Sequence, residues 1–437
     1  MEIVRKRQRE GVVDVPLSNG RLSNERPSNG RVLALRTATP GLFAVKGSFR
    51  TAPAADPRER LLQQLVAALT TCGSLRHDAF AMEDLLDSRG ASLSVESELQ
   101  RVAFSASACS ADLPLVVELL AECLREPAFD AAQVATEQAR LIAELEYRAA
   151  EPAVLAAGAL SRALYPPSHP RHDVDPAEQI AQLERFTVDD VRRYHRDRFG
   201  ANDLCIVIVG DIDPLAAAAQ FDRHFSAWSP QPMSRIDDAS AQPESNAGQI
   251  IRIAAPGREH FDAALGHRLA LRCDDPDYMA LWMANHILGA TFNSRLVASV
   301  REAQGLTYSI RSYLAKPDPA YDGHWQIDLS LSPDKLDAGL AATRAELARF
   351  VDQGVSAEEL AAKQIQAIGG FQISLATLYG LSDAMLFGAE RGWGPDHIHD
   401  FPGRIDRVTA AQLDRVIATH LRPDAMCTAI AGPFDSL

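Results

Sequence analysis

The sequence has 437 residues, of which 46% are hydrophobic and 23% are charged, and its formal net charge is -14. This is the composition of a soluble globular protein, long enough for two or three domains with separate cores. The acidic balance and the lack of a long Lys/Arg block argue against nucleic acid or a membrane surface as a partner. No apolar run approaches the roughly 20 residues of a membrane span.

The cysteines and the N-terminus bear on the compartment. The six cysteines form no C-x-x-C pair and lie mostly in apolar runs, so we expect small buried side chains rather than a zinc or disulfide framework. The N-terminal stretch "MEIVRKRQREGVVDV" is positively charged, but no apolar segment follows it. No signal peptide is therefore expected, which favours a cytoplasmic protein, or a periplasmic one if a signal has been removed.

The first half of the chain alternates strand and helix patterns. A strand candidate at 41–49 precedes "LLQQLVAALTTCGS" (61–74), an apolar helix with no charge, histidine or carboxylate. Alternating apolar and polar residues at 91–108 predict strand structure. Helical patterns follow at 113–127 and 129–144.

The second half repeats this order after a change of composition. Residues 229–249 are rich in Pro, Ser, Asn and Gly, which is typical of a linker. Strand candidates and two long helical patterns follow, the second of which resembles residues 129–144. The strand candidates lie at 249–255, 263–271, 306–315 and 324–331, and the helical patterns at 336–354 and 355–370.

One segment occurs twice. Residues 185–213 align without a gap to 407–435 at an offset of 222, with seven identities. Each copy reads as a Thr N-cap, an amphipathic helix, a turn and an apolar strand ending in Gly. We therefore predict an α+β fold of two homologous α/β halves, each a mixed sheet with helices packed on it, from an internal duplication. The halves are 1–228 and 250–437, joined by a linker at 229–249; the alternative is a chance match of two common units.

The stretch with the most distinctive pattern of residues is "HILGATFNSRLVASVREAQGLTYSIRSYLA", His286–Ala315. We expect a helix from about Asn293 to Ala303, a left-handed Gly305 and a strand from Leu306. This pattern resembles the C-terminal half of the pitrilysin/insulinase family of zinc peptidases, which includes the mitochondrial processing peptidases. Four further stretches carry the resemblance over nearly the whole chain: "LSNG" (17–20), "GASLSVESE" (90–98), "LYPPSHP" (164–170) and "NDLCIVIVGD" (202–211).

The resemblance implies a clamshell that closes around an unfolded peptide. One half would carry zinc on an H-x-x-E-H helix with a distal Glu ligand, and the opposite half would supply an Arg and a Tyr seven residues apart. Arg301 and Tyr308 have that spacing. Arg presents a fork of donors for a carbonyl or carboxylate, and a Tyr hydroxyl can donate to an oxyanion. Without the motif, the plainer interpretation is a charge at a helix end and a half-buried ring.

The metal helix of the first half is degenerate. The family motif is followed by Gly-Thr five residues after its second His, and Gly73-Ser74 aligns with that pair. Gln64, Ala67 and Ala68 then replace His, Glu and His, so neither the ligands nor the base that activates water is present. The distal position falls at Glu144, and one carboxylate cannot hold a catalytic zinc. The histidine pairs at 169/172 and 397/399 lack an evident third ligand, so this chain is expected to hold no metal cofactor.

These residues lead to one functional hypothesis and two rivals. The chain would be the non-zinc subunit of a heterodimeric zinc metallopeptidase, inactive alone. Its Arg301 and Tyr308 would bind short or unfolded peptides and complete the site of a homologous H-x-x-E-H partner, which holds the zinc. The rivals are an inert structural subunit, similar to the core proteins of the respiratory cytochrome bc complex, and a peptide-binding homodimer. A homodimeric active peptidase is disfavoured by the composition of residues 64–68.

Overall fold

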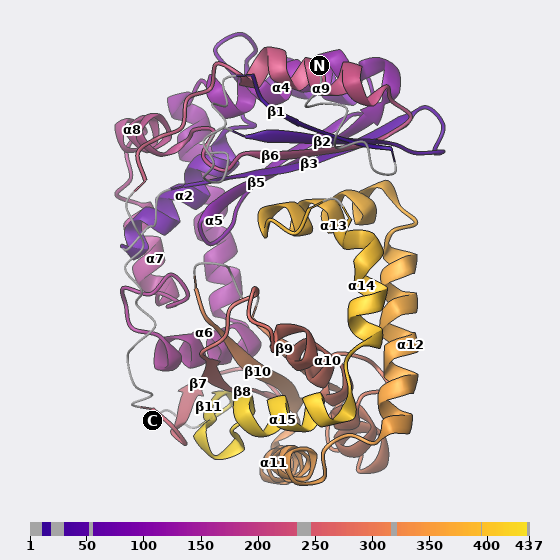
Figure 1. Cartoon of the computed structure of the whole chain (residues 1–437). Coiled ribbons are helices and arrows are strands. Elements are labelled where there is room, and N and C mark those ends of the chain that lie inside the picture. Colours follow the sequence, from indigo (N-terminus) through magenta and orange to yellow (C-terminus); the bar gives the residue numbers. More distant parts are fainter. Residues whose placement is uncertain are drawn as a thin grey trace. The chain divides into compact units, whose positions relative to one another are not determined.

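A computed structural model describes residues 11–18, 30–51, 56–233, 246–315, 321–394 and 396–434. The chain forms two compact units (Figure 1). The first comprises Met1–Ala143, Gln179–Arg235 and Gln372–Ile398, and the second comprises Glu144–Glu178, Ile236–Phe371 and His399–Leu437. Most of the linker predicted at 229–249, the last two residues of "LSNG" and the final residue of the 407–435 repeat lie outside the described residues.

The first unit contains a six-stranded sheet in the order β1-β2-β6-β3-β5-β4. Its strands are β1 (Val12–Pro16), β2 (Arg31–Arg36), β6 (Cys205–Gly210), β3 (Leu42–Arg50), β5 (Arg101–Cys109) and β4 (Ser92–Ser97). Only β2 and β6 run parallel, and all other neighbours are antiparallel. β6 is buried along its whole length, as expected for a central strand covered on both faces.

The second unit contains a five-stranded sheet in the order β7-β11-β8-β10-β9. Its strands are β7 (Ile250–Ala254), β11 (Cys427–Gly432), β8 (Phe261–Leu269), β10 (Gly323–Leu331) and β9 (Ser309–Leu314). Here too the first pair, β7 and β11, is parallel and the rest are antiparallel. This order and these directions match β2-β6-β3-β5-β4 strand for strand, which supports the predicted duplication.

The repeated segments adopt the same local structure. Helix α8 (Val188–Arg198) begins at Thr187 and helix α15 (Ala410–His420) begins at Thr409. Each threonine hydroxyl accepts a bond from the backbone N–H three residues on, and the side chain at that position accepts from the threonine N–H in return. Such a reciprocal cap satisfies two otherwise unpaired donors and fixes the start of a helix. Both predicted N-caps are confirmed.

One helix from each half of the sequence covers the sheet formed by the other half. Helix α13 (Leu378–Glu390) packs on β3 and β6 of the first sheet, on the face opposite α4 (Leu113–Arg125) and α9 (Pro214–Phe225) (Figure 1). Helix α6 (Pro152–Leu164) packs on β8 and β11 of the second sheet, where its Leu160 meets Ala264 and Ala429. The helical patterns alone do not indicate this exchange.

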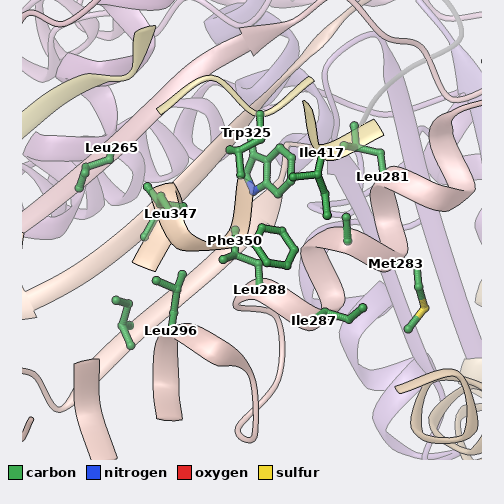
Figure 2. Close-up of a cluster of buried hydrophobic side chains, with 14 of the residues drawn as sticks. Leu265, Leu281, Met283, Ile287, Leu288, Leu296, Trp325, Leu347, Phe350 and Ile417 are labelled. Atoms are coloured by element: carbon green, nitrogen blue, oxygen red, sulfur yellow. The ribbon is translucent and has the colours of Figure 1, made fainter. Parts of the chain in front are cut away.

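The other face of the second sheet carries the main core of that unit. Trp325 and Ile327 of β10 pack against helices α10 (Tyr278–Leu288), α11 (Leu336–Gln353) and α15, and Figure 2 shows Trp325 beside Phe350 and Ile417. The indole N–H of Trp325 donates to Ser312 Oγ at 2.8 Å, so its one polar atom is satisfied inside the core. The remaining α-helices of the described residues are α2 (Pro57–Leu69), α3 (Ala79–Asp87), α5 (Ala131–Ala149), α7 (Pro176–Leu183), α12 (Ala357–Ser374) and α14 (His397–Asp406).

Some sequence-based expectations need correction. Residues 91–108 form two antiparallel strands rather than one, and the strand expected from Leu306 begins at Ser309. Cys109 is exposed and Cys72 is half-buried, whereas the other four cysteines are buried as expected. Strands β1 and β2 were not predicted. No helix in the described part of the chain is long and apolar enough to cross a membrane.

Candidate functional site

Helix α2 carries the positions where the family motif would lie. Asp56 caps it by accepting from the Arg58 N–H at 2.8 Å, and Pro57 occupies the first turn, where its missing donor costs nothing. Ala67 is only 1% exposed, while Gln64 and Ala68 are half-buried. Two alanine methyl groups and an amide offer no imidazole or carboxylate, so these residues do not fit a catalytic zinc ion.

The buried polar side chain of α2 is the neighbouring Gln63, which the sequence analysis missed. Its Oε1 accepts from Thr51 Oγ1 at 2.8 Å and from the Tyr194 hydroxyl at 3.1 Å. Its Nε2 donates to Ser97 Oγ and to the Glu98 carbonyl at 3.0 and 2.9 Å. Gln63 therefore ties α2 to the turn between β4 and β5, which is a structural role.

The distal position, Glu144, is exposed on α5. It belongs to the second unit, whereas positions 64, 67 and 68 belong to the first. Across the described ranges, no three His, Cys, Asp or Glu side chains are grouped so that they could hold a metal ion.

The histidines of the 169/172 pair pack inside the second unit. His169 is buried, its Nε2 lies 3.2 Å from Asp322 Oδ1, and its ring stacks on Tyr165 with centroids 4.3 Å apart. His172 Nδ1 lies 2.7 Å from the Tyr165 carbonyl oxygen. Arg268 Nη2 donates to the second carboxylate oxygen of Asp322 at 2.6 Å. Burial raises the pKa of Asp322, but the bonds from His169 and Arg268 outweigh it and leave that pKa below its usual value.

The other pair is divided between the units. His397 is buried against Trp393, with ring centroids 4.5 Å apart. His399 is exposed and belongs to the second unit, whereas His397 belongs to the first. Both residues lie on α14, although Gly and Pro residues around them favour a loop.

Arg301 and Tyr308 lie together in the second unit. Arg301 is on a π-helical segment, Val297–Ala303, whose Val297 and Val300 are buried in the core. Gly305 has φ 60°, the left-handed conformation expected for it, and its N–H donates to the Arg301 carbonyl at 3.0 Å. The chain then turns back, and Arg301 Cζ lies 4.9 Å from the centre of the Tyr308 ring. The two predicted site residues are therefore in contact.

A third residue, Phe292, also contacts Arg301, and the sequence analysis did not single it out. Arg301 Cζ also lies 4.7 Å from the centre of the Phe292 ring. Phe292 and Tyr308 are 71% and 84% exposed, whereas the Arg301 side chain is only 25% exposed. The one signal in the sequence is an aromatic residue between polar ones in "ATFNSRL", which is too common to be informative without the structure.

The cluster leaves hydrogen-bond donors available. Arg301 Nε lies 3.4 Å from Glu302 Oε1, and within the described ranges its two terminal nitrogens donate to no acceptor. Stacking against an aromatic face restrains a guanidinium and leaves the N–H groups in its plane accessible. The arrangement can hold a carbonyl or carboxylate oxygen with the exposed Tyr308 hydroxyl nearby. We refer to Phe292, Arg301 and Tyr308 as the arginine cluster.

Comparison with known families identifies the chain. Residues 64–169 match the family described as "Insulinase (Peptidase family M16)", and residues 185–367 match the "Peptidase M16 inactive domain". The chain belongs to the M16 family of peptidases, as the resemblance to pitrilysin and insulinase implied. The first match begins at Gln64, where the metal motif would start.

Individual relatives and one solved structure agree with this assignment. A Streptomyces coelicolor protein named as an uncharacterized zinc protease is 22% identical over 415 residues, covering 92% of this chain and 86% of the relative. A Bacillus subtilis protein named as a probable inactive metalloprotease is 21% identical over 237 residues, 54% of this chain and 53% of the relative. A Pseudomonas fluorescens structure described as a peptidase M16 inactive domain shares the fold, with TM-score 0.83, 24% identity and coverage of 97% and 99%. Both halves of the chain thus match M16 domains, and the model that matches the second half is the one described as inactive.

Proposed function

We propose that this chain is the non-zinc subunit of a heterodimeric M16 peptidase. A homologous partner would carry H-x-x-E-H and its zinc ion, and the substrates would be short or unfolded peptides. The observation that carries the proposal is the arginine cluster, in which Arg301 and Tyr308 are in contact, Tyr308 is exposed, and the terminal nitrogens of Arg301 donate to no acceptor in the described residues. The proposal is supported by the combination of this cluster with an α2 helix that has no zinc ligands.

Each residue of the pair would have a separate task. Arg301 would hold a peptide carbonyl or a terminal carboxylate with its in-plane N–H groups, which orients the chain for attack. The Tyr308 hydroxyl would donate to the oxyanion that develops on the scissile carbonyl. Losing one such donor costs roughly 2.7–4 kcal/mol of transition-state stabilisation, or about 10²–10³-fold in kcat. Activation of water would be supplied by the partner's metal site.

The test is hydrolysis of an unstructured fluorogenic peptide by this chain, by a co-expressed H-x-x-E-H homologue, and by the pair. We expect activity in the pair only, with Arg301→Ala and Tyr308→Phe each reducing it by about 10²-fold or more. The chain offers a matched control on β9, where Arg311 Cζ lies 5.3 Å from the centre of the Tyr313 ring. Arg311→Ala and Tyr313→Phe should leave activity unchanged.

Two results would contradict the proposal. One is pair activity that is indifferent to both changes in the arginine cluster. The other is no activity in any mixture. Peptide affinity without cleavage would then favour the peptide-binding homodimer, and neither cleavage nor affinity would favour a structural subunit.

A further inference from the structure

Phe292 is presented by a loop whose two ends are fixed in the core. The loop, residues 289–294, runs from Leu288 at the end of α10 to a helical turn at Arg295 and Leu296, which continues into the π-helical segment. Both leucines are fully buried and lie in the cluster drawn in Figure 2. Gly289 is packed so closely that an added Cβ would lie 2.5 Å from Ser312 Cβ, and its carbonyl accepts from the Ser312 N–H at 2.9 Å.

The middle of the loop is fixed by α12. The buried ammonium group of Lys363 donates to the Asn293 carbonyl at 2.8 Å and to Asn293 Oδ1 at 2.7 Å. Two residues further on, where the helical turn begins, Arg295 donates to Glu359 Oε1 at 2.9 Å and to the Gly354 carbonyl at 2.8 Å. Burying the charge of Lys363 is costly unless it is well hydrogen-bonded, so the position of Asn293, next to Phe292, is strongly determined.

Phe292 remains exposed although the loop that carries it is fixed at both ends and beside the ring. Fully burying a Phe side chain stabilises a fold by roughly 1.5–3 kcal/mol, and that contribution is largely forgone here. Exposed aromatic rings beside an Arg are typical of binding hot spots, and a fixed loop loses little entropy when a ligand binds. The Arg301 guanidinium contacts the Phe292 ring, yet 71% of the residue is accessible.

We propose that Phe292 forms the wall of an apolar subsite that selects a large aliphatic or aromatic side chain in the bound peptide. The inference rests on the proposed function, because it places this side chain beside a carbonyl held by Arg301. An extended peptide advances about 3.3 Å per residue, and Arg301 Cζ lies 4.7 Å from the ring centre. The selected side chain is therefore within one or two residues of that carbonyl.

The test uses peptides that differ at one position, with Phe, Leu, Ala or Asp there. The ratio of kcat/KM for the Phe and Ala peptides is measured for the pair with wild-type chain, Phe292→Ala and Phe292→Leu. We expect a ratio of about 10 or more in the wild type, most of it kept in Phe292→Leu and nearly all lost in Phe292→Ala. Ile365→Ala is the matched control, because Ile365 is equally exposed, at 74%, on α12; its ratio should not change.

The ratio separates two effects of the Phe292→Ala substitution. If the ring only restrains Arg301, all peptides are cleaved more slowly and the ratio stays the same. If it forms a subsite, the ratio falls towards one. An unchanged ratio in a cleaving pair would overturn the inference and leave the proposed function intact.

Binding to the chain alone keeps the two proposals distinguishable. Fluorescence anisotropy with the same labelled peptides should show tighter binding of the Phe peptide, and Phe292→Ala should abolish the difference. If the pair never cleaves but this preference is present, the subsite stands and the peptidase role fails. If neither cleavage nor binding discriminates between the peptides, the subsite is refuted.

Discussion

Removing the carboxylate of Asp322 should destabilise the second unit strongly. Asp322 and Arg268 are both buried and joined by a 2.6 Å bond, and His169 contacts the other carboxylate oxygen at 3.2 Å. Asp322→Ala leaves a buried guanidinium without its counter-charge, which typically costs about 3–5 kcal/mol. The matched control in the same unit is Glu151→Ala, since Glu151 pairs with Arg258 at 3.1 Å and their side chains are 35% and 33% exposed. Such exposed pairs are worth about 0–1 kcal/mol.

Urea unfolding followed by tryptophan fluorescence measures this difference. Trp282 and Trp325 belong to the second unit and Trp228 and Trp393 to the first. A background in which the latter pair is replaced by Phe therefore reports on the second unit alone. A loss below 1 kcal/mol for Asp322→Ala, equal to that of the control, would refute the idea that Asp322 stabilises the buried charge. The same result would remove stabilisation of the buried ion pair as the explanation for the contact between His169 and Asp322.

Three further predictions concern the helix exchange, the histidines and the metal. Cutting the chain within 234–245 should give two pieces that are insoluble alone but form a 1:1 complex together. The reason is that α6 and α13 each cover the sheet formed by the other half. A soluble, folded N-terminal piece would contradict this prediction. Burial lowers the pKa of His195 and of His324 to about 4 in the folded protein. In the unfolded state both histidines have a pKa of about 6.5, so between about pH 6.5 and 4 the unfolded state binds more protons than the folded state. The free energy of unfolding should fall as the pH drops from 6.5 towards 4, and His324→Gln should flatten that slope; an equal slope would count against a neutral buried His324. Finally, the purified chain should contain well under one zinc by elemental analysis, with an unfolding midpoint that EDTA does not change. Stoichiometric zinc would contradict the absence of ligands on α2.

Sequence periodicity predicted the elements that carry a strong local signal. The two Thr-capped helices and the apolar strands that follow them are such elements, since caps and buried strands depend on neighbouring residues. Strands β1 and β2 have weaker patterns, and β1 lies at the edge of its sheet. The exchange of α6 and α13 was not predictable, because an apolar helix face does not indicate which sheet it covers.

The candidate site was predictable only in part. The sequence predicted a helix, a left-handed Gly305 and a strand around Arg301 and Tyr308, and the resemblance implied that both residues serve the site. Neither predicted that their side chains are in contact. Phe292 was missed because its exposure depends on Lys363, 71 positions away in the sequence, and on the packing of Gly289 against Ser312. Contacts of this kind are fixed by tertiary packing and leave no local pattern.

The central claim is that this chain completes the active site of a zinc-carrying partner. The most direct measurement is to titrate it into a fixed amount of the H-x-x-E-H homologue while following hydrolysis of an unstructured peptide. We predict that activity rises from near zero and saturates at one chain per partner, and that Arg301→Ala binds the partner equally well without restoring activity. Full activity of the homologue alone, or equal activation by Arg301→Ala, would contradict the account.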